Sequence, residues 1–413
     1  MGTTVETRIT SEQGKEAIYQ AHLSKDAIEK VSKINSSASE IDALINELKG
    51  LKASATQINY IADEERAVPD GFDISLLPYF RVWKKKGTRL FETNIKAKKV
   101  FEDVFADKIV YVDIAIGDDT TGTGTISNPY KTLYKGLSTK PLSPSNGGKL
   151  TVYVKAGTYA DANGWNATNI YAAEINVIAY NGLVTSTQSV STSYNGQIES
   201  GKKSYIEGIV FDGGKSPFNF IHAANVFTTA YFKNCAFNNS VSENGFQTVR
   251  NGLYILENCK AKGNVLDGFN YHNYDTIKNN LVIEINCQGI YNGKTGATNN
   301  GSTVHEETKI IRINGIYNYN SNRNIQDIGS CRSWNLGCEA SYGAQTTELN
   351  FALGVGIDTD YSKMWLDNCI SNGSNFGAGI YQLSVNSTLY AYEYIDNCTQ
   401  ASTYIPIAYD YKA

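Results

Sequence analysis

Excess basic charge and long apolar runs are both missing from this sequence. Its 413 residues carry 37 Lys and Arg against 41 Asp and Glu, for a formal net charge of −4. Nucleic acids and anionic membrane surfaces attract proteins with an excess of positive charge. No apolar run approaches the roughly 18 residues that a membrane span requires. We therefore expect no nucleic-acid partner and no insertion into a membrane.

Histidine and cysteine are scarce, with 4 and 7 residues. No CxxC pair and no Cys/His pair at metal-ligand spacing occurs, so we predict no metal site and no cofactor. The N-terminus has neither a basic n-region nor an apolar h-region, so we expect synthesis in the cytoplasm without a signal peptide. Abundant residues are 28 Tyr, 36 Gly and many Asn. This composition is typical of a turn-rich β-protein with an aromatic surface.

The first segment, residues 11–52, has a heptad pattern. Apolar residues recur at the two seam positions: Ala27, Val31, Ile34, Ala38, Ile41, Ile45 and Leu48. Such a seam is buried against partner helices, so we predict an α-helical coiled coil. A single amphipathic helix packed on its own domain would use a similar stripe. We assign residues 1–70 to this helical segment and residues 71–108 to a small connecting region.

Short strands punctuated by Gly and Asn fill residues 109–413, and one motif recurs seven times. It consists of apolar residues, then a polar residue or Asn, then Cys or Gly. The last positions are Cys235, Cys259, Cys287, Gly315, Cys338, Cys369 and Cys398, separated by 24, 28, 28, 23, 31 and 29 residues. A period of this length is that of a solenoid whose turns bury their inner faces against one another. We therefore predict an all-β main body built as a parallel β-helix of about 8–10 coils.

The repeat also predicts a role for the cysteines. In stacked turns, six of the seven would form one interior column of reduced, small apolar side chains. The preceding Asn residues would form a hydrogen-bonded ladder at a bend. The alternative is that the Asn-Cys pair recurs by chance in an Asn-rich chain.

The segments Tyr111–Leu137 and Thr151–Tyr159 carry a resemblance to a known family. The matching residues are Tyr111, Asp113, Gly122, Thr123, Asn128, Pro129, Tyr130, Thr132, Val152, Val154, Gly157 and Tyr159. They resemble the first coil of pectin-lyase-like right-handed parallel β-helices. The resemblance implies that fold, with a short helix that covers the open end of the stack and its unpaired backbone.

A coiled coil ahead of such a β-helix further resembles phage virion appendages: tailspikes, receptor-binding tail fibres and head fibres. The resemblance implies a homotrimer, located in the virion and attached through its N-terminus to other virion structural proteins. It also implies binding to a host cell-surface polysaccharide as a receptor-binding protein. Two alternatives remain: a polysaccharide depolymerase, hydrolase or lyase, that uses the same β-helix face, and a structural head fibre or capsid decoration.

Two histidines fall into register between neighbouring coils. The stretches Asn264–His272 and Thr298–His305 align at a shift of 33 residues, which pairs His272 with His305. Strand alternation then sends Phe269, Tyr271 and Val304 inward, and both histidines outward. Glu307 shares the face of His305 if the strand continues. Glu306 would then point inward at a high cost, so we expect the strand to end there and the backbone to turn.

Around the two histidines lie further polar and aromatic side chains: acids, an amide, a guanidinium and an indole. Aromatic rings stack on sugar rings, while Asp, Asn and Arg bind hydroxyl or uronate groups. The predicted glycan-binding residues are Asn270, His272, Asp275, His305, Arg332 and Trp334, and the candidate catalytic acids are Asp267, Asp327 and Glu307. The alternative is that the histidines are polar rungs of a solvated ladder and that Asp267 only closes a turn before Gly268.

Overall fold

The computed structural model describes residues 81–85, 88–92, 108–141, 148–160, 165, 170–221, 226–276, 278–294, 299–343, 349–354, 360–373, 379–382, 386–392 and 394–398. The chain divides into two compact units, residues 1–100 with 409–413 and residues 101–408. The described part of the first unit is an antiparallel hairpin of β1 (Arg81–Lys85) and β2 (Thr88–Glu92). The predicted coiled coil lies outside the described residues, and the trimer and the assigned boundaries stay predictions.

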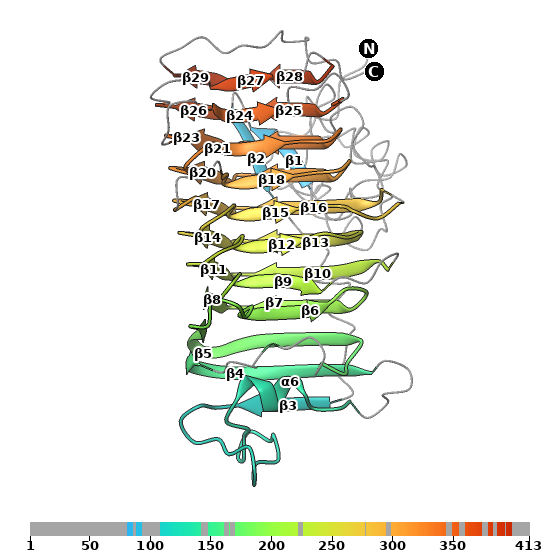
Figure 1. Cartoon of the computed structure of the whole chain (residues 1–413), viewed down its shortest axis with the longest axis vertical. Helices are drawn as coiled ribbons and strands as arrows, with labels where there is room; N and C mark the ends of the chain where they lie inside the picture. Colours follow the sequence, from blue (N-terminus) through green and yellow to red (C-terminus); the bar gives the residue numbers. More distant parts are fainter. Residues whose placement is uncertain are drawn as a thin grey trace, which may run out of the picture. The chain divides into compact units, whose positions relative to one another are not determined.

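The second unit is a stack of turns, in which each strand pairs in parallel with its counterparts in the turns before and after (Figure 1). Three rows of strands run along the stack. The first row contains β3 (Lys108–Val112), β4 (Lys149–Tyr159), β5 (Glu174–Gln188), β7 (Lys203–Glu207), β10 (Thr228–Lys233), β13 (Gly252–Glu257), β16 (Asn280–Ile285), β19 (Lys309–Ile313), β22 (Arg332–Leu336), β25 (Lys363–Asp367) and β28 (Thr388–Tyr392).

The second row continues from the C-terminal half of β5. It contains β8 (Ile209–Gly213), β11 (Ala236–Asn238), β14 (Lys260–Lys262), β17 (Gln288–Ile290), β20 (Ile316–Asn318), β23 (Glu339–Ser341), β26 (Ile370–Asn372) and β29 (Ile395–Asn397). The third row is a separate 8-stranded sheet of β6 (Gly196–Glu199), β9 (Phe218–Ile221), β12 (Phe246–Thr248), β15 (Phe269–Tyr271), β18 (Ser302–Val304), β21 (Arg323–Asp327), β24 (Leu349–Leu353) and β27 (Ile380–Gln382). The predicted parallel β-solenoid is therefore confirmed, with about eight turns. The sense of the coil stays a prediction.

The short helix expected from the family resemblance is α6 (Leu133–Leu137). Thr132 caps it, because its side chain accepts a hydrogen bond from the Lys135 backbone N–H at 3.2 Å. Leu133 and Leu137 are buried, and a Cβ atom added to Gly136 would lie 2.5 Å from a Val112 methyl group. The helix thus packs closely on the first strands of the stack (Figure 1).

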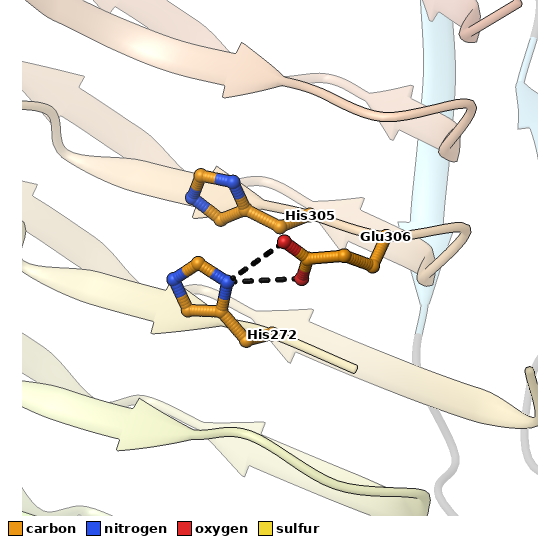
Figure 2. A group of neighbouring side chains, drawn as sticks. All are labelled: His272, His305 and Glu306. Atoms are coloured by element: carbon orange, nitrogen blue, oxygen red, sulfur yellow. Dashed lines mark hydrogen bonds and ion pairs between the residues drawn. The ribbon is translucent and has the colours of Figure 1, made fainter. Parts of the chain in front are cut away.

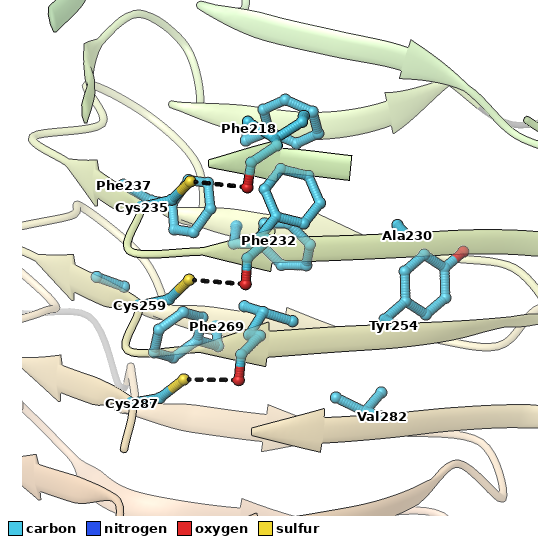
Figure 3. Close-up of a cluster of buried hydrophobic side chains, with 14 of the residues drawn as sticks. Phe218, Ala230, Phe232, Cys235, Phe237, Tyr254, Cys259, Phe269, Val282 and Cys287 are labelled. Carbon is cyan, nitrogen blue, oxygen red and sulfur yellow. Dashed lines mark hydrogen bonds between the residues drawn. The ribbon is translucent and has the colours of Figure 1, made fainter. Parts of the chain in front are cut away.

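The cysteines form the predicted interior column (Figure 3). All seven are reduced, and five of the six column cysteines are buried: Cys235, Cys259, Cys287, Cys338 and Cys369. Cys398, in the last described turn, is partly exposed, and Cys331, which lies outside the repeat, is buried too. The Cys259 Sγ lies 3.5 Å from the Phe232 carbonyl oxygen, and the Cys287 Sγ lies 3.4 Å from that of Leu256. These two thiols are therefore small apolar groups that also donate weakly to the preceding turn.

The Asn residue before the Cys or Gly of several repeats makes the predicted bend. Asn234, Asn258, Asn286, Asn314 and Asn368 have φ between 51° and 53°. Asn tolerates this left-handed conformation better than other residues with a side chain. The Asn258 amide donates to the Asn234 side chain at 3.1 Å, and the Asn286 amide donates to Asn258 at 3.0 Å. The Asn ladder is therefore confirmed.

No helix in the described ranges is long and apolar enough to cross a membrane.

Candidate functional site

The two histidines lie at the corner between the third row and the first row. β15 and β18 pair in parallel with Tyr271 opposite Val304, and both of these side chains are fully buried. The next residues, His272 and His305, are therefore opposite each other. Their rings stack with centroids 3.9 Å apart and an interplanar angle of 13°. The predicted register of the histidines is confirmed.

Glu306 completes the cluster, although it is not one of the predicted site residues. β18 ends at Val304, and both Glu306 and Glu307 adopt positive φ angles of 48° and 59°. The expected end of the strand is thus confirmed, and the turn brings the Glu306 carboxylate to His272 (Figure 2). The His272 Nδ1 lies 2.9 Å and 3.2 Å from its two oxygens, and the Asn273 backbone N–H donates to one of them at 3.1 Å. Glu306 is therefore held in place by two partners.

Burial and neighbouring charge set the protonation of this cluster. Burial, and then the charge of His272, lower the pKa of His305 to about 3, so its imidazole is uncharged near neutral pH. Burial alone would raise the pKa of Glu306. The His272 hydrogen bond and charge, with the Asn273 N–H, outweigh it and hold that pKa below its usual range. The cluster therefore contains an anionic carboxylate beside a neutral imidazole.

Tyr274 adds an exposed aromatic ring to the corner. It lies two residues after His272, and its ring stacks on that imidazole at 4.9 Å with an interplanar angle of 21°. The Tyr274 side chain is 56% exposed, while its backbone N–H donates to the Val249 carbonyl at 3.1 Å. Tyr274 therefore provides a solvent-exposed aromatic surface beside imidazole and carboxylate groups.

Three of these side chains could hold a metal ion. One donor atom from each of His272, His305 and Glu306 lies within 4.8 Å of the others. Among the described residues, no hydrogen bond is made by the His305 ring nitrogens. Ligand spacing along the chain does not reveal such a site, because the donors come from two turns of the solenoid.

Asp267 and Asn270 are paired with each other instead of facing solvent. The Asn270 amide donates to Asp267 at 2.7 Å, and the Asn300 backbone N–H of the next turn donates to the same carboxylate at 2.6 Å. Both residues are only 6% exposed. Burial raises the pKa of Asp267 above its ordinary value. The exposed placement predicted for these two is therefore wrong, and Asp267 holds the backbone of the next solenoid turn.

Asp275 and Glu307 also differ from their predicted placement. The Asp275 carboxylate is buried, lies 3.2 Å from the Arg250 guanidinium and accepts from the Asn251 N–H at 2.9 Å. It therefore orders the backbone of the preceding turn. Glu307 is exposed, but because the strand ends before it, Glu306 takes the place beside the histidines.

Asp327 points inward, so its predicted outward placement is wrong. It lies opposite Val304 in the pairing of β18 with β21 and is fully buried. Its carboxylate lies 3.3 Å from the Arg312 guanidinium and accepts a hydrogen bond from Ser333. Burial raises the pKa of Asp327. Arg312 also donates to Ser302 at 2.9 Å, and Ser302 donates to Glu284 at 2.9 Å, so a charged network fills this part of the interior.

Arg332 and Trp334 belong to β22 in the first row, one row away from β15 and β18. Arg332 is exposed, and its backbone N–H donates to the Thr308 carbonyl at 3.1 Å. Trp334 is only 1% exposed, and its ring stacks on Trp365 at 5.0 Å. Trp334 therefore cannot serve as the exposed aromatic surface that was predicted, whereas Tyr274 can.

Comparisons with known proteins give the fold alone. No protein-family model matches the chain, and no curated protein matches it significantly. Among solved structures, the pectate lyase Pel9A is similar with a TM-score of 0.50 and 13% identity, over 73% of this chain and 80% of that one.

Two further structures align less well. An alginate lyase from Paenibacillus sp. str. FPU-7 has a TM-score of 0.39 and 10% identity, over 72% of this chain and 97% of that one. A GH136 lacto-N-biosidase from Eubacterium ramulus has a TM-score of 0.23 and 10% identity, over 94% and 81%. The likeness to the pectate lyase agrees with the β-helix described above.

Proposed function

We propose that this protein binds a host cell-surface polysaccharide at the corner formed by His272, Tyr274, His305 and Glu306. The observation that carries the proposal is the exposed Tyr274 ring stacked on His272, beside the Glu306 carboxylate. An aromatic ring can cover the apolar face of a sugar, while imidazole and carboxylate groups bind its hydroxyls. The similarity in fold to a pectate lyase, a protein named for its action on a polysaccharide, supports this ligand class.

The biological setting that we propose is a virion appendage, a tailspike or fibre that serves as a receptor-binding protein. Its support is the family resemblance of the sequence. In this proposal the N-terminal segment attaches to other virion structural proteins and assembles three chains. Light scattering on the purified full chain should give the mass of a trimer, and the mass of a single chain would contradict the trimer.

A polysaccharide depolymerase is the second candidate, and the His272–Glu306 pair favours it. A carboxylate that fixes an imidazole is a common arrangement for proton transfer. Asp327 and Asp267 contribute little to this candidate because both are buried. The acid–base groups would instead be His272 and Glu306.

The binding test uses an array of bacterial surface polysaccharides and the full chain. The double variant His272→Ala/His305→Ala should lose about 1–3 kcal/mol of binding free energy, because each lost polar contact costs about that order. Its circular dichroism spectrum should remain that of the native protein. Unchanged binding by the folded double variant would refute the site, and no binding to any polysaccharide would favour a structural decoration.

Cleavage is tested on each polysaccharide that binds. Release of new reducing ends or of unsaturated uronate products by the wild type, and its loss in Glu306→Gln, would establish a depolymerase. Binding without release would leave the receptor-binding role alone.

A further inference from the structure

We propose that His272, His305 and Glu306 bind one divalent transition-metal ion of the Zn²⁺, Co²⁺ or Ni²⁺ class. Three side-chain donors converge at one corner of the solenoid, and all lie within 4.8 Å of one another. The proposal goes beyond polysaccharide binding and does not depend on it, because the ion is tested in the absence of sugar.

The donor set selects this class of ion. Two imidazoles and one carboxylate suit Zn²⁺ and related ions, whereas Ca²⁺ and Mg²⁺ prefer oxygen ligands only. Three protein ligands also leave coordination positions open, as in catalytic zinc sites. Water or a sugar hydroxyl could occupy them.

The separations between the donor atoms require only small side-chain movements for all three to reach one ion. In a tetrahedral site with bonds of about 2.1 Å, donor atoms lie about 3.4 Å apart. The Glu306 oxygens already lie 2.9 Å and 3.2 Å from the His272 Nδ1. The widest separation, at most 4.8 Å, would contract by about 1.4 Å, within reach of a rotation of His305.

A second observation is independent of these distances. His305 is partly buried, and among the described residues its ring nitrogens make no hydrogen bond. An incoming ion would therefore not have to displace a protein partner from this imidazole.

Secondary contacts would keep the ligands in position. The Asn273 backbone N–H donates to a Glu306 oxygen at 3.1 Å, and the His305 backbone N–H donates to the Tyr271 carbonyl at 2.9 Å. Such outer contacts orient metal ligands and limit their loss of entropy on binding. The parallel pairing of β15 with β18 also fixes the backbones from which the two imidazoles project.

The test is titration of the chelator-treated full chain with Zn²⁺ and with Co²⁺, followed by calorimetry and by visible absorption of Co²⁺. We expect one ion per chain and a Co²⁺ spectrum of nitrogen and oxygen ligands, without the thiolate band that the cysteines would produce. Glu306→Gln and His305→Ala should each weaken binding at least tenfold. The double variant His22→Ala/His222→Ala removes the other histidines and should bind as the wild type does.

Two results would overturn the proposal. One is the absence of binding by the wild type at millimolar Zn²⁺. The other is binding that Glu306→Gln leaves unchanged. Glu306→Gln is the decisive variant, because it keeps the size of a partly exposed side chain and should not prevent folding. If the protein does not bind the metal ion, the result of the polysaccharide array is unaffected. The two proposals can therefore fail separately.

Discussion

His272 and His305 stack face to face with ring centroids 3.9 Å apart, because consecutive turns of the solenoid bring residues 33 positions apart into register. Glu306 follows directly after His305 and reaches back to His272 at 2.9 Å. The corner therefore combines groups from two turns, and Tyr274 provides its exposed aromatic ring.

Removal of the aromatic ring should weaken polysaccharide binding. We expect Tyr274→Ala to cost about 1–2 kcal/mol, as is usual for an aromatic side chain at the centre of a binding site. Biolayer interferometry with immobilised polysaccharide measures this change. Tyr171→Ala is the matched control, since Tyr171 is also about half exposed but lies several turns away, before β5. Equal losses in the two variants would contradict a specific role for Tyr274.

The cysteine column predicts a pattern of thiol reactivity. Burial raises the pKa of the Cys259, Cys331 and Cys369 thiols, which disfavours the reactive thiolate. In the native protein we expect six thiols to resist a maleimide reagent, while the partly exposed Cys398 reacts. All seven should react after denaturation. The Cys398→Ser variant should show no native labelling, and rapid labelling of this variant would refute the buried column.

Much of this fold could be predicted from the sequence, because every turn of a solenoid repeats the same local pattern of strands and bends. The spacing of the Asn-Cys pairs indicated the turn length, and the alternation around Tyr271 and Val304 indicated which side chains face inward. The histidine pair followed from the same register. These features depend on residues close in the sequence and on the repeat itself.

The rest of the site depends on where individual turns depart from the repeat. Glu306 reaches His272 only because two successive residues adopt positive φ. Asp327 lies inside because Arg312 of the neighbouring turn provides a buried cation. Trp334 was expected to be exposed, yet it stacks on Trp365 of the next turn and is buried. Alternation within β21 places Asp327 on the same inward face as Ile325, but it gives no signal for the Arg312 partner or for the turn at Glu306.

The Asn ladder predicts different losses of stability for two small substitutions. Asn286 has φ 51° and donates to Asn258. Asn286→Ala should cost about 1–2 kcal/mol, because Ala is strained in this conformation and the ladder bond is lost. Asn286→Gly should cost less, since Gly adopts positive φ freely, as Gly337 does at the equivalent bend with φ 64°. Melting temperatures measure the difference, and a Gly variant less stable than the Ala variant would contradict the explanation.

The interior charged network should depend on Arg312. Arg312→Leu leaves Asp327 buried without its cation, which should cost about 3–5 kcal/mol. The triple variant Glu284→Leu/Arg312→Leu/Asp327→Leu removes all three charges and should be more stable than Arg312→Leu alone. Chemical denaturation compares the two. A triple variant less stable than the single one would contradict this account.

The stability of the Arg312→Leu variant should depend on pH. The pKa of Asp327 is already raised by burial, and loss of Arg312 should raise it further. A carboxyl group whose pKa is higher in the folded state destabilises the fold above that pKa, and the penalty disappears as the pH falls towards the unfolded value of about 4. The melting-temperature gap between Arg312→Leu and the wild type should therefore narrow as the pH is lowered. A gap that widens would show that another group dominates.

The central claim is that a polysaccharide binds at the corner of His272, Tyr274, His305 and Glu306. The most direct test is a crystal structure of the full chain with an oligosaccharide from the polysaccharide that binds best. We predict that one sugar ring lies against Tyr274 and that its hydroxyls contact His272, His305 or Glu306. An oligosaccharide bound on another face, with this corner occupied only by solvent, would contradict the claim.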